Sequence, residues 1–128
     1  MKPHPPSWPT AATILPADSL LWLQVRSAIR QAELVTGYQE LDELSKRLLE
    51  WIAERVGRDE GGLYVSEIIR HSEIASPSAL SKLLVGLKAR GLISVVSDPN
   101  DRRCRLVGIT ESSIELLSRL SAQLRVSL

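Results

Sequence analysis

The chain has 128 residues, of which 44% are hydrophobic, with one cysteine and no phenylalanine. This length predicts a single domain with a sizeable core, which excludes disorder of the whole chain. A lone cysteine excludes an internal disulfide or a four-cysteine zinc site as the source of stability. There is no apolar run of ~18–20 residues and no basic-then-apolar leader, so we expect a cytoplasmic protein without a membrane segment.

The formal net charge is only +1, but the charge is unevenly distributed along the chain. Residues 1–69 sum to −3 and residues 70–128 to +4. Residues 70–105 hold seven basic and three acidic side chains. Such a local excess attracts polyanions, although a solvated surface with a modest excess is also common.

Prolines are concentrated near the N-terminus, where five of the seven lie within the first sixteen residues. Proline has no backbone N–H to donate, so a helix or central strand is excluded there. We therefore expect residues 1–17 to be a flexible tail and residues 18–128 to form one domain.

Two long helices are expected first. One apolar stripe follows Asp18, a good N-cap, and stops at Gly37. The next runs from Leu41 to about Gly57 with a charged outer face. These patterns indicate core and scaffold rather than a ligand site.

Two short helices joined by a tight turn come next. We expect Ser66 to cap the first, and Ser76 to cap the second with Pro77 at its first position, where a missing N–H costs nothing. The second helix, about residues 76–90, turns its leucines inward. Its outer face holds only small, apolar or basic residues and no acid: Ser78, Ser81, Lys82, Val85 and Lys88. This is the form of a helix-turn-helix.

A β-hairpin is expected directly after that helix. Leu92–Ser97 and Arg105–Ile109 are rich in β-branched residues, and the six residues Asp98–Arg103 between them form turns readily. A hairpin in this place is a wing, at about residues 97–105.

A last helix is expected from Glu111, with Thr110 as its cap. Its apolar side, and that of the helix after Asp18, must be buried somewhere. We expect a homodimer interface there, although the two helices could instead pack against each other within one chain. The expected interface residues are Leu21, Trp22, Ile114, Leu117, Leu120 and Leu124.

Residues 63–113 resemble the MarR family of winged helix-turn-helix transcription regulators. The most specific stretches are Gly86–Ile93, Asp98–Arg103 and Leu106–Glu111. The resemblance implies a mainly α (α+β) fold with a small β-hairpin wing and flanking dimerisation helices. It also implies a homodimer that reads duplex DNA, with one helix in the major groove and a wing arginine in the minor groove. In many members a small anionic aromatic effector weakens DNA binding.

Carried over to this chain, the resemblance assigns DNA contacts to Ser76, Ser78, Ser81, Lys82 and Arg103, with Asp98 and Asp101 positioning the wing. Elementary chemistry agrees, because a helix N-terminus and short hydroxyl donors suit phosphate, and an arginine suits a narrow minor groove. Arg102 and Arg105 extend the cationic surface. For Ser76 alone, ordinary helix capping is the simpler interpretation.

Catalytic and metal-binding patterns are absent from the sequence. His4, His71 and Cys104 lack metal-ligand spacing, and no phosphate loop or nucleophile elbow occurs. We expect no enzyme, no metal and no cofactor. A thiol between Arg103 and Arg105 leaves open a redox switch at Cys104.

The sequence thus predicts a homodimeric, DNA-binding transcription regulator with an unknown small-molecule effector. The alternative is a winged-helix protein-protein interaction module with a vestigial DNA face. A continuous positive surface around Ser78, Lys82 and Arg103 would favour DNA binding. Acidic side chains covering that surface would favour the protein-protein interaction module.

Overall fold

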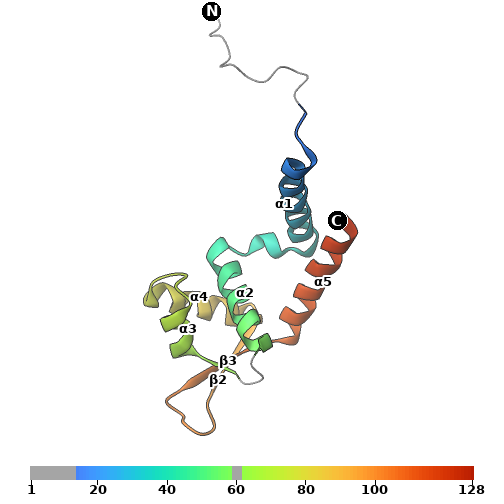
Figure 1. Cartoon of the computed structure of the whole chain (residues 1–128). Coiled ribbons are helices and arrows are strands. Elements are labelled where there is room, and N and C mark those ends of the chain that lie inside the picture. The colour runs from blue at the N-terminus through green and yellow to red at the C-terminus, as the bar shows by residue number, and fades with distance from the viewer. Residues whose placement is uncertain (1–13, 59–61) are drawn as a thin grey trace, which may run out of the picture.

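A computed structural model describes residues 14–58 and 62–128. Most of the expected tail, residues 1–13, lies outside this part of the chain. Helices dominate the described residues, and three short strands complete them (Figure 1). In chain order the elements are α1 Ala17–Thr36, the short 3₁₀ helix η1 Tyr38–Glu40, α2 Glu43–Arg58, β1 Leu63–Tyr64, α3 Val65–His71, α4 Pro77–Ala89, β2 Ile93–Ser97, β3 Arg105–Ile109 and α5 Glu111–Ser127.

The strands form one antiparallel sheet in the order β1-β3-β2. In the hairpin, Ile93 pairs with Ile109 and Ser97 with Arg105, so β2 and β3 are fully aligned. Figure 1 shows the hairpin projecting at the end of the molecule opposite to the start of α1. The expected wing is therefore present at the expected residues.

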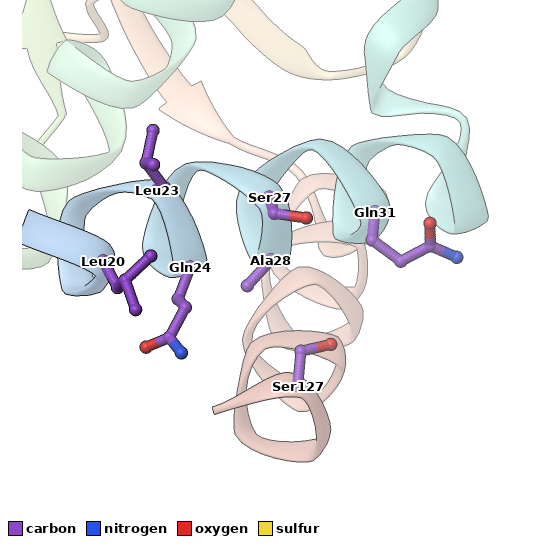
Figure 2. A pocket seen from close by; sticks show the side chains of 7 residues that line it. All are labelled: Leu20, Leu23, Gln24, Ser27, Ala28, Gln31 and Ser127. Carbon is purple, nitrogen blue, oxygen red and sulfur yellow. The ribbon is translucent and has the colours of Figure 1, made fainter. Parts of the chain in front are cut away.

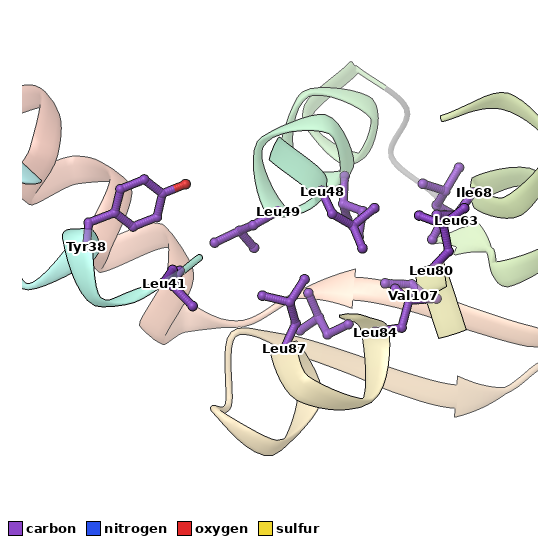
Figure 3. Close-up of a cluster of buried hydrophobic side chains, with 12 residues drawn as sticks. Tyr38, Leu41, Leu48, Leu49, Leu63, Ile68, Leu80, Leu84, Leu87 and Val107 are labelled. Atoms are coloured by element: carbon purple, nitrogen blue, oxygen red, sulfur yellow. The ribbon is translucent and has the colours of Figure 1, made fainter. Parts of the chain in front are cut away.

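The core lies between α2, α3, α4 and the inner face of the sheet (Figure 3). Leu48 and Ile52 of α2 are fully buried, and they belong to the same cluster as Leu80 of α4 and Val107 of β3. Burying a leucine or isoleucine side chain contributes about 1.5–3 kcal/mol, so this cluster fixes how α4 sits on the sheet.

The helices at the two ends of the chain pack against each other, because α5 runs alongside α1 (Figure 1). Ala28 and Ala32 are the buried residues of α1. The start of α5 is tied to the turn after α4, where the Thr110 hydroxyl donates to the Gly91 carbonyl at 2.7 Å and Ser113 donates to the carbonyl of Leu92.

Several expected helix ends are confirmed. Gly37 ends α1 with a φ of +81°, a conformation that glycine adopts without strain. Ser76 caps α4 by accepting from the Ala79 N–H at 3.3 Å, and Pro77 is its first residue. Thr110 likewise caps α5 by accepting from the Ser113 N–H at 3.2 Å.

Two expected caps are wrong. Helix α1 begins at Ala17, so Asp18 lies inside the first turn of the helix. There the negative charge of Asp18 interacts favourably with the positive end of the helix dipole. Helix α3 begins at Val65, so Ser66 lies inside it. Its start is instead satisfied by Glu67, whose carboxylate accepts from the Tyr64 N–H at 3.4 Å. Strand β1 runs directly into α3 and leaves no loop position for a serine cap.

Candidate nucleic-acid interface

The outer face of α4 is open to solvent and free of acidic residues. The helix rests on the core through Leu80, Leu84 and Leu87, which are buried. Because a helix turns 100° per residue, the opposite stripe consists of every third or fourth residue. That stripe is Ser78, Lys82, Val85 and Ala89, all exposed.

The serines at the start of α4 have different partners. The Ser76 hydroxyl oxygen caps the helix, as the helix-capping interpretation of this residue predicted. Ser81 donates its hydroxyl to the Pro77 carbonyl at 3.1 Å, within the same helix. The Ser76 and Ser78 hydroxyls are 3.4 Å apart. Each hydroxyl still has an oxygen that can accept or a hydrogen that can turn outward.

Asp98 organises the base of the wing. Although it is charged, it is buried with only 6% of its surface exposed. Its carboxylate accepts from the Tyr64 hydroxyl at 2.6 Å and from the Asn100 N–H at 2.9 Å. The hydrogen bond from Tyr64 holds the pKa of Asp98 below its usual value.

Asp101 organises the wing tip in the same way. Its Oδ1 accepts from the backbone N–H of Arg103 at 3.1 Å and from the Arg103 Nε at 3.2 Å. The Arg103 side chain remains 91% exposed, so this contact orients the guanidinium without burying it. The side-chain hydrogen bond from Arg103 lowers the pKa of Asp101. Arg102 and Arg105 are exposed as well.

Cys104 lies in the wing, where its thiol faces Asp101 at 3.6 Å. Burial and the nearby Asp101 carboxylate raise the pKa of this thiol, and the lowering effect of Arg103 is the weaker one. A redox-sensitive cysteine needs the opposite shift. The structure therefore argues against the redox-switch hypothesis.

The residues expected at a dimer interface fall into two groups. Leu21, Trp22 and Ile114 are exposed, by 57%, 67% and 55%. By contrast, Leu117, Leu120 and Leu124 are partly covered because they face α1 of the same chain. Packing of α1 on α5 within one chain, left open above, therefore accounts for the second group.

A groove of about 470 Å³ lies along α1 from Leu20 to Gln31, beside the end of α5 (Figure 2). Leu20, Leu23 and Gln24 of α1 and Ser127 of α5 line it. Figure 2 shows that the side chains of Leu20 and Gln24 lie on the same side of α1 as Ser127 of α5. This end of α1 therefore has apolar surface that residues 14–58 and 62–128 do not cover.

A second cavity of about 280 Å³ lies farther along, between α1, α2 and α5. Ile29, Ala32 and the three α5 leucines provide its apolar walls, with Glu33 and Glu50 as its charged groups. Glu33 pairs with the buried Lys46 at 3.1 Å, and Glu50 accepts from the Tyr38 hydroxyl at 2.7 Å. Burial and this hydrogen bond raise the pKa of Tyr38.

Within residues 14–58 and 62–128, no cluster of three or more His, Cys, Asp or Glu side chains could hold a metal ion. No helix in the same ranges is both long and apolar enough to span a bilayer. His4 lies outside the described residues, and His71 ends α3.

The sequence profile described as the MarR family matches residues 41–103, which run from the core helix α2 to the wing arginine. Over these residues the chain matches the MarR family. Its fold is accordingly the winged helix-turn-helix, with α3 and α4 as the helix pair and the β2–β3 hairpin as the wing.

Solved structures of MarR-family regulators resemble the chain over most of its length. A MepR mutant from S. aureus bound to an oligodeoxyribonucleotide has a TM-score of 0.67 and 18% identity, covering 88% of this chain and 79% of that one. S. aureus MepR bound to ethidium bromide has a TM-score of 0.65 and 18% identity, with 88% and 77% covered. A MarR-family transcriptional regulator from Rhodococcus sp. RHA1 has a TM-score of 0.54 and 25% identity, with 85% and 71% covered. No curated protein sequence matches the chain.

Proposed function

We propose that this MarR-family chain is a sequence-specific, duplex-DNA-binding transcription regulator that acts as a homodimer. The observation that carries the proposal is the exposed, acid-free outer face of α4, followed in the fold by a wing with exposed Arg102, Arg103 and Arg105. The DNA-bound MepR mutant, which shares the fold, supports the same function.

In this proposal α4 enters the major groove. Ser76, Ser78 and Ser81 lie near its N-terminus, where backbone N–H groups and hydroxyls suit phosphate and base edges. Lys82 directly follows Ser81, one turn after Ser78, and supplies a cation to a base or phosphate.

The wing enters the neighbouring minor groove with Arg103 at its tip. Asp101 orients that side chain, and Asp98 fixes the wing base, so the guanidinium is directed before DNA arrives. Arg102 and Arg105 neutralise phosphates on either side. Glu33 and Glu50 do not oppose this assignment, because they bind Lys46 and Tyr38 at the cavity between α1, α2 and α5, which no residue of α4 or the wing lines.

A homodimer follows from recognition geometry. One helix reads only a few base pairs, and two half-sites one helical turn apart, about 34 Å, need two copies. The exposed Leu21, Trp22 and Ile114 provide apolar surface for the contact.

The 280 Å³ cavity is a candidate effector site, and its charge favours a cation. Glu33 and Glu50 are the charged side chains that line it, and the nearest cation, Lys46, is paired with Glu33, so negative charge exceeds positive charge at the cavity. The family resemblance alone implied an anionic aromatic. The ethidium complex of MepR is consistent with a planar cation instead. Calorimetry with DNA-free protein should show binding of ethidium and none of benzoate, and the reverse order would refute a cation site.

The central test is a DNA titration with the full chain. Duplexes selected from a random library should bind with an affinity that falls steeply with salt, because Lys and Arg contacts release counterions. With ~6–10 phosphate contacts per dimer, the loss between 50 and 200 mM salt is about 10³- to 10⁵-fold. Absence of binding at low salt would favour the protein-protein interaction module.

Arg103→Ala should weaken binding to the selected duplex by about 1–3 kcal/mol and relax preference for A·T-rich flanks. Arg119→Ala is the matched control, since Arg119 is exposed on α5, away from the wing, and its loss should leave affinity unchanged. Equal affinities of the two variants would show that Arg103 does not contact the DNA.

A further inference from the structure

Val85 is a large apolar side chain within the exposed stripe of α4 formed by Ser78, Lys82, Val85 and Ala89. It is 69% exposed, between Lys82 one turn before it and Ala89 one turn after it. A lone exposed valine is ordinary on a protein surface, and its position alone would need no explanation. What distinguishes Val85 is its surroundings.

The residue after Val85 is a glycine that the described residues do not require. A Cβ added at Gly86 would meet no atom within 4 Å, although glycine is unfavourable inside a helix. Gly86 does not have a positive φ either, so its backbone does not demand glycine. Close approach of a partner from outside would account for the missing side chain.

The protein surface beside Val85 is positively charged. A hollow of about 280 Å³ between α4 and the sheet has Val85, Lys88 and Arg105 among its lining residues. An exposed apolar side chain next to these cations and Lys82 suits a polyanionic partner that carries a small apolar group on its surface. The C5-methyl group of thymine, in the major groove of duplex DNA, is such a group.

We propose that Val85 is a specificity-determining residue that contacts the methyl group of one thymine in each half-site, with Gly86 allowing the strand to approach closely. This inference rests on the proposed DNA-binding function and deepens it. Lys82 and the serines would supply polar contacts, and Val85 would supply discrimination for thymine over cytosine at one position.

Deoxyuridine substitution tests the contact, because it removes only the methyl group of thymine. Each thymine of a selected duplex is replaced in turn, and the affinity of the full chain is measured by anisotropy. We expect one position per half-site at which uridine weakens binding about fourfold, the effect of one buried methyl group.

The same scan with Val85→Ala should show that this thymine-to-uridine ratio falls toward one. Alanine favours helix at an exposed position, so the variant is expected to fold. Val35→Ala is the matched control, since Val35 is an exposed valine on α1, and it should keep the fourfold ratio.

Two results would overturn the inference. One is that uridine has no effect at any position, and the other is that Val85→Ala keeps the full ratio. In both cases selective DNA binding would remain, and the proposed function would stand. If the chain selects no duplex at all, the proposed function and this inference fail together.

Discussion

At the scale of single residues, Gly86 offers a gain in stability. Because a Cβ at this position meets nothing within 4 Å and φ is not positive, alanine fits the native helix without strain. Gly86→Ala should therefore raise the free energy of unfolding by about 1 kcal/mol, as measured by urea denaturation. Gly91→Ala is the control, since its φ of +73° makes alanine strained and should lower stability by about 1 kcal/mol. Destabilisation by Gly86→Ala would mean that the helix is not regular there.

Tyr64 and Asp98 give the wing a pH dependence. The Tyr64 hydrogen bond lowers the pKa of Asp98 in the folded state, so it stabilises the fold above the ordinary aspartate pKa of about 3.9 and is lost as the pH falls through the lowered value. Tyr64→Phe should therefore be less stable than the parent at pH 7, and the difference should shrink as the pH falls below about 4.

Urea denaturation of both proteins between pH 7 and pH 3 measures this difference. The other acids with lowered pKa values, Asp42 and Asp101, keep their partners in both proteins and cancel in the comparison. A difference that stays constant across this range would show that the hydroxyl acts by packing alone.

Helix caps could be predicted from the sequence because they involve neighbouring residues, whereas a hydrogen bond between residues far apart in the chain could not. Ser76, Pro77 and Thr110 mark helix starts through neighbours three residues away, and all three predictions are confirmed. The hydrogen bond from Tyr64 to Asp98 joins positions 34 residues apart, and the two come together only because β1 and β2 both pair with β3. No spacing rule in the sequence could have indicated Tyr64.

At the scale of elements, α5 turns a different face inward than its apolar residues suggest. Residues at successive spacings of three drift by 60° around a helix, so Ile114 and Leu120 do not share a face. Ser113 is buried and Ile114 is exposed, while Leu120 packs against the core cluster. The elements themselves were predictable, but the face of α5 depends on where α1 lies.

Replacing Leu120 and Leu124 with glutamate should consequently destabilise the chain by about 2 kcal/mol or more, because two charges would be placed against α1. Thermal unfolding by circular dichroism measures the loss. Ile114→Glu, on the exposed side of the same helix, should change the unfolding temperature little at low protein concentration. A stable double variant would mean that α5 does not pack on α1.

At the scale of the whole molecule, the first half of α1 has no partner within the described chain. It extends away from the winged domain (Figure 1), and Leu21 and Trp22 are exposed on it. Only the guanidinium of Arg26 lies over the Trp22 ring, at 6.0 Å. An interface here is predictable from the sequence, since the run Leu20–Leu23 is apolar on every side of the helix.

Leu21→Glu combined with Trp22→Glu should yield a folded monomer that has lost most of its affinity for the selected duplex. Both side chains are exposed in the single chain, so the charges do not enter the core. Sedimentation at tens of micromolar should show the parent as a dimer and the variant as a monomer. A monomeric parent, or a dimeric variant, would exclude this interface.

The proposed homodimer predicts that the resistance of the fold to heat depends on protein concentration. Any contact that covers Leu21 and Trp22 with a second copy involves two molecules, so its contribution obeys mass action and grows with protein concentration. The melting temperature of this protein should therefore rise over a dilution series from nanomolar to micromolar, and a single melting temperature describes it only together with the concentration at which it was measured.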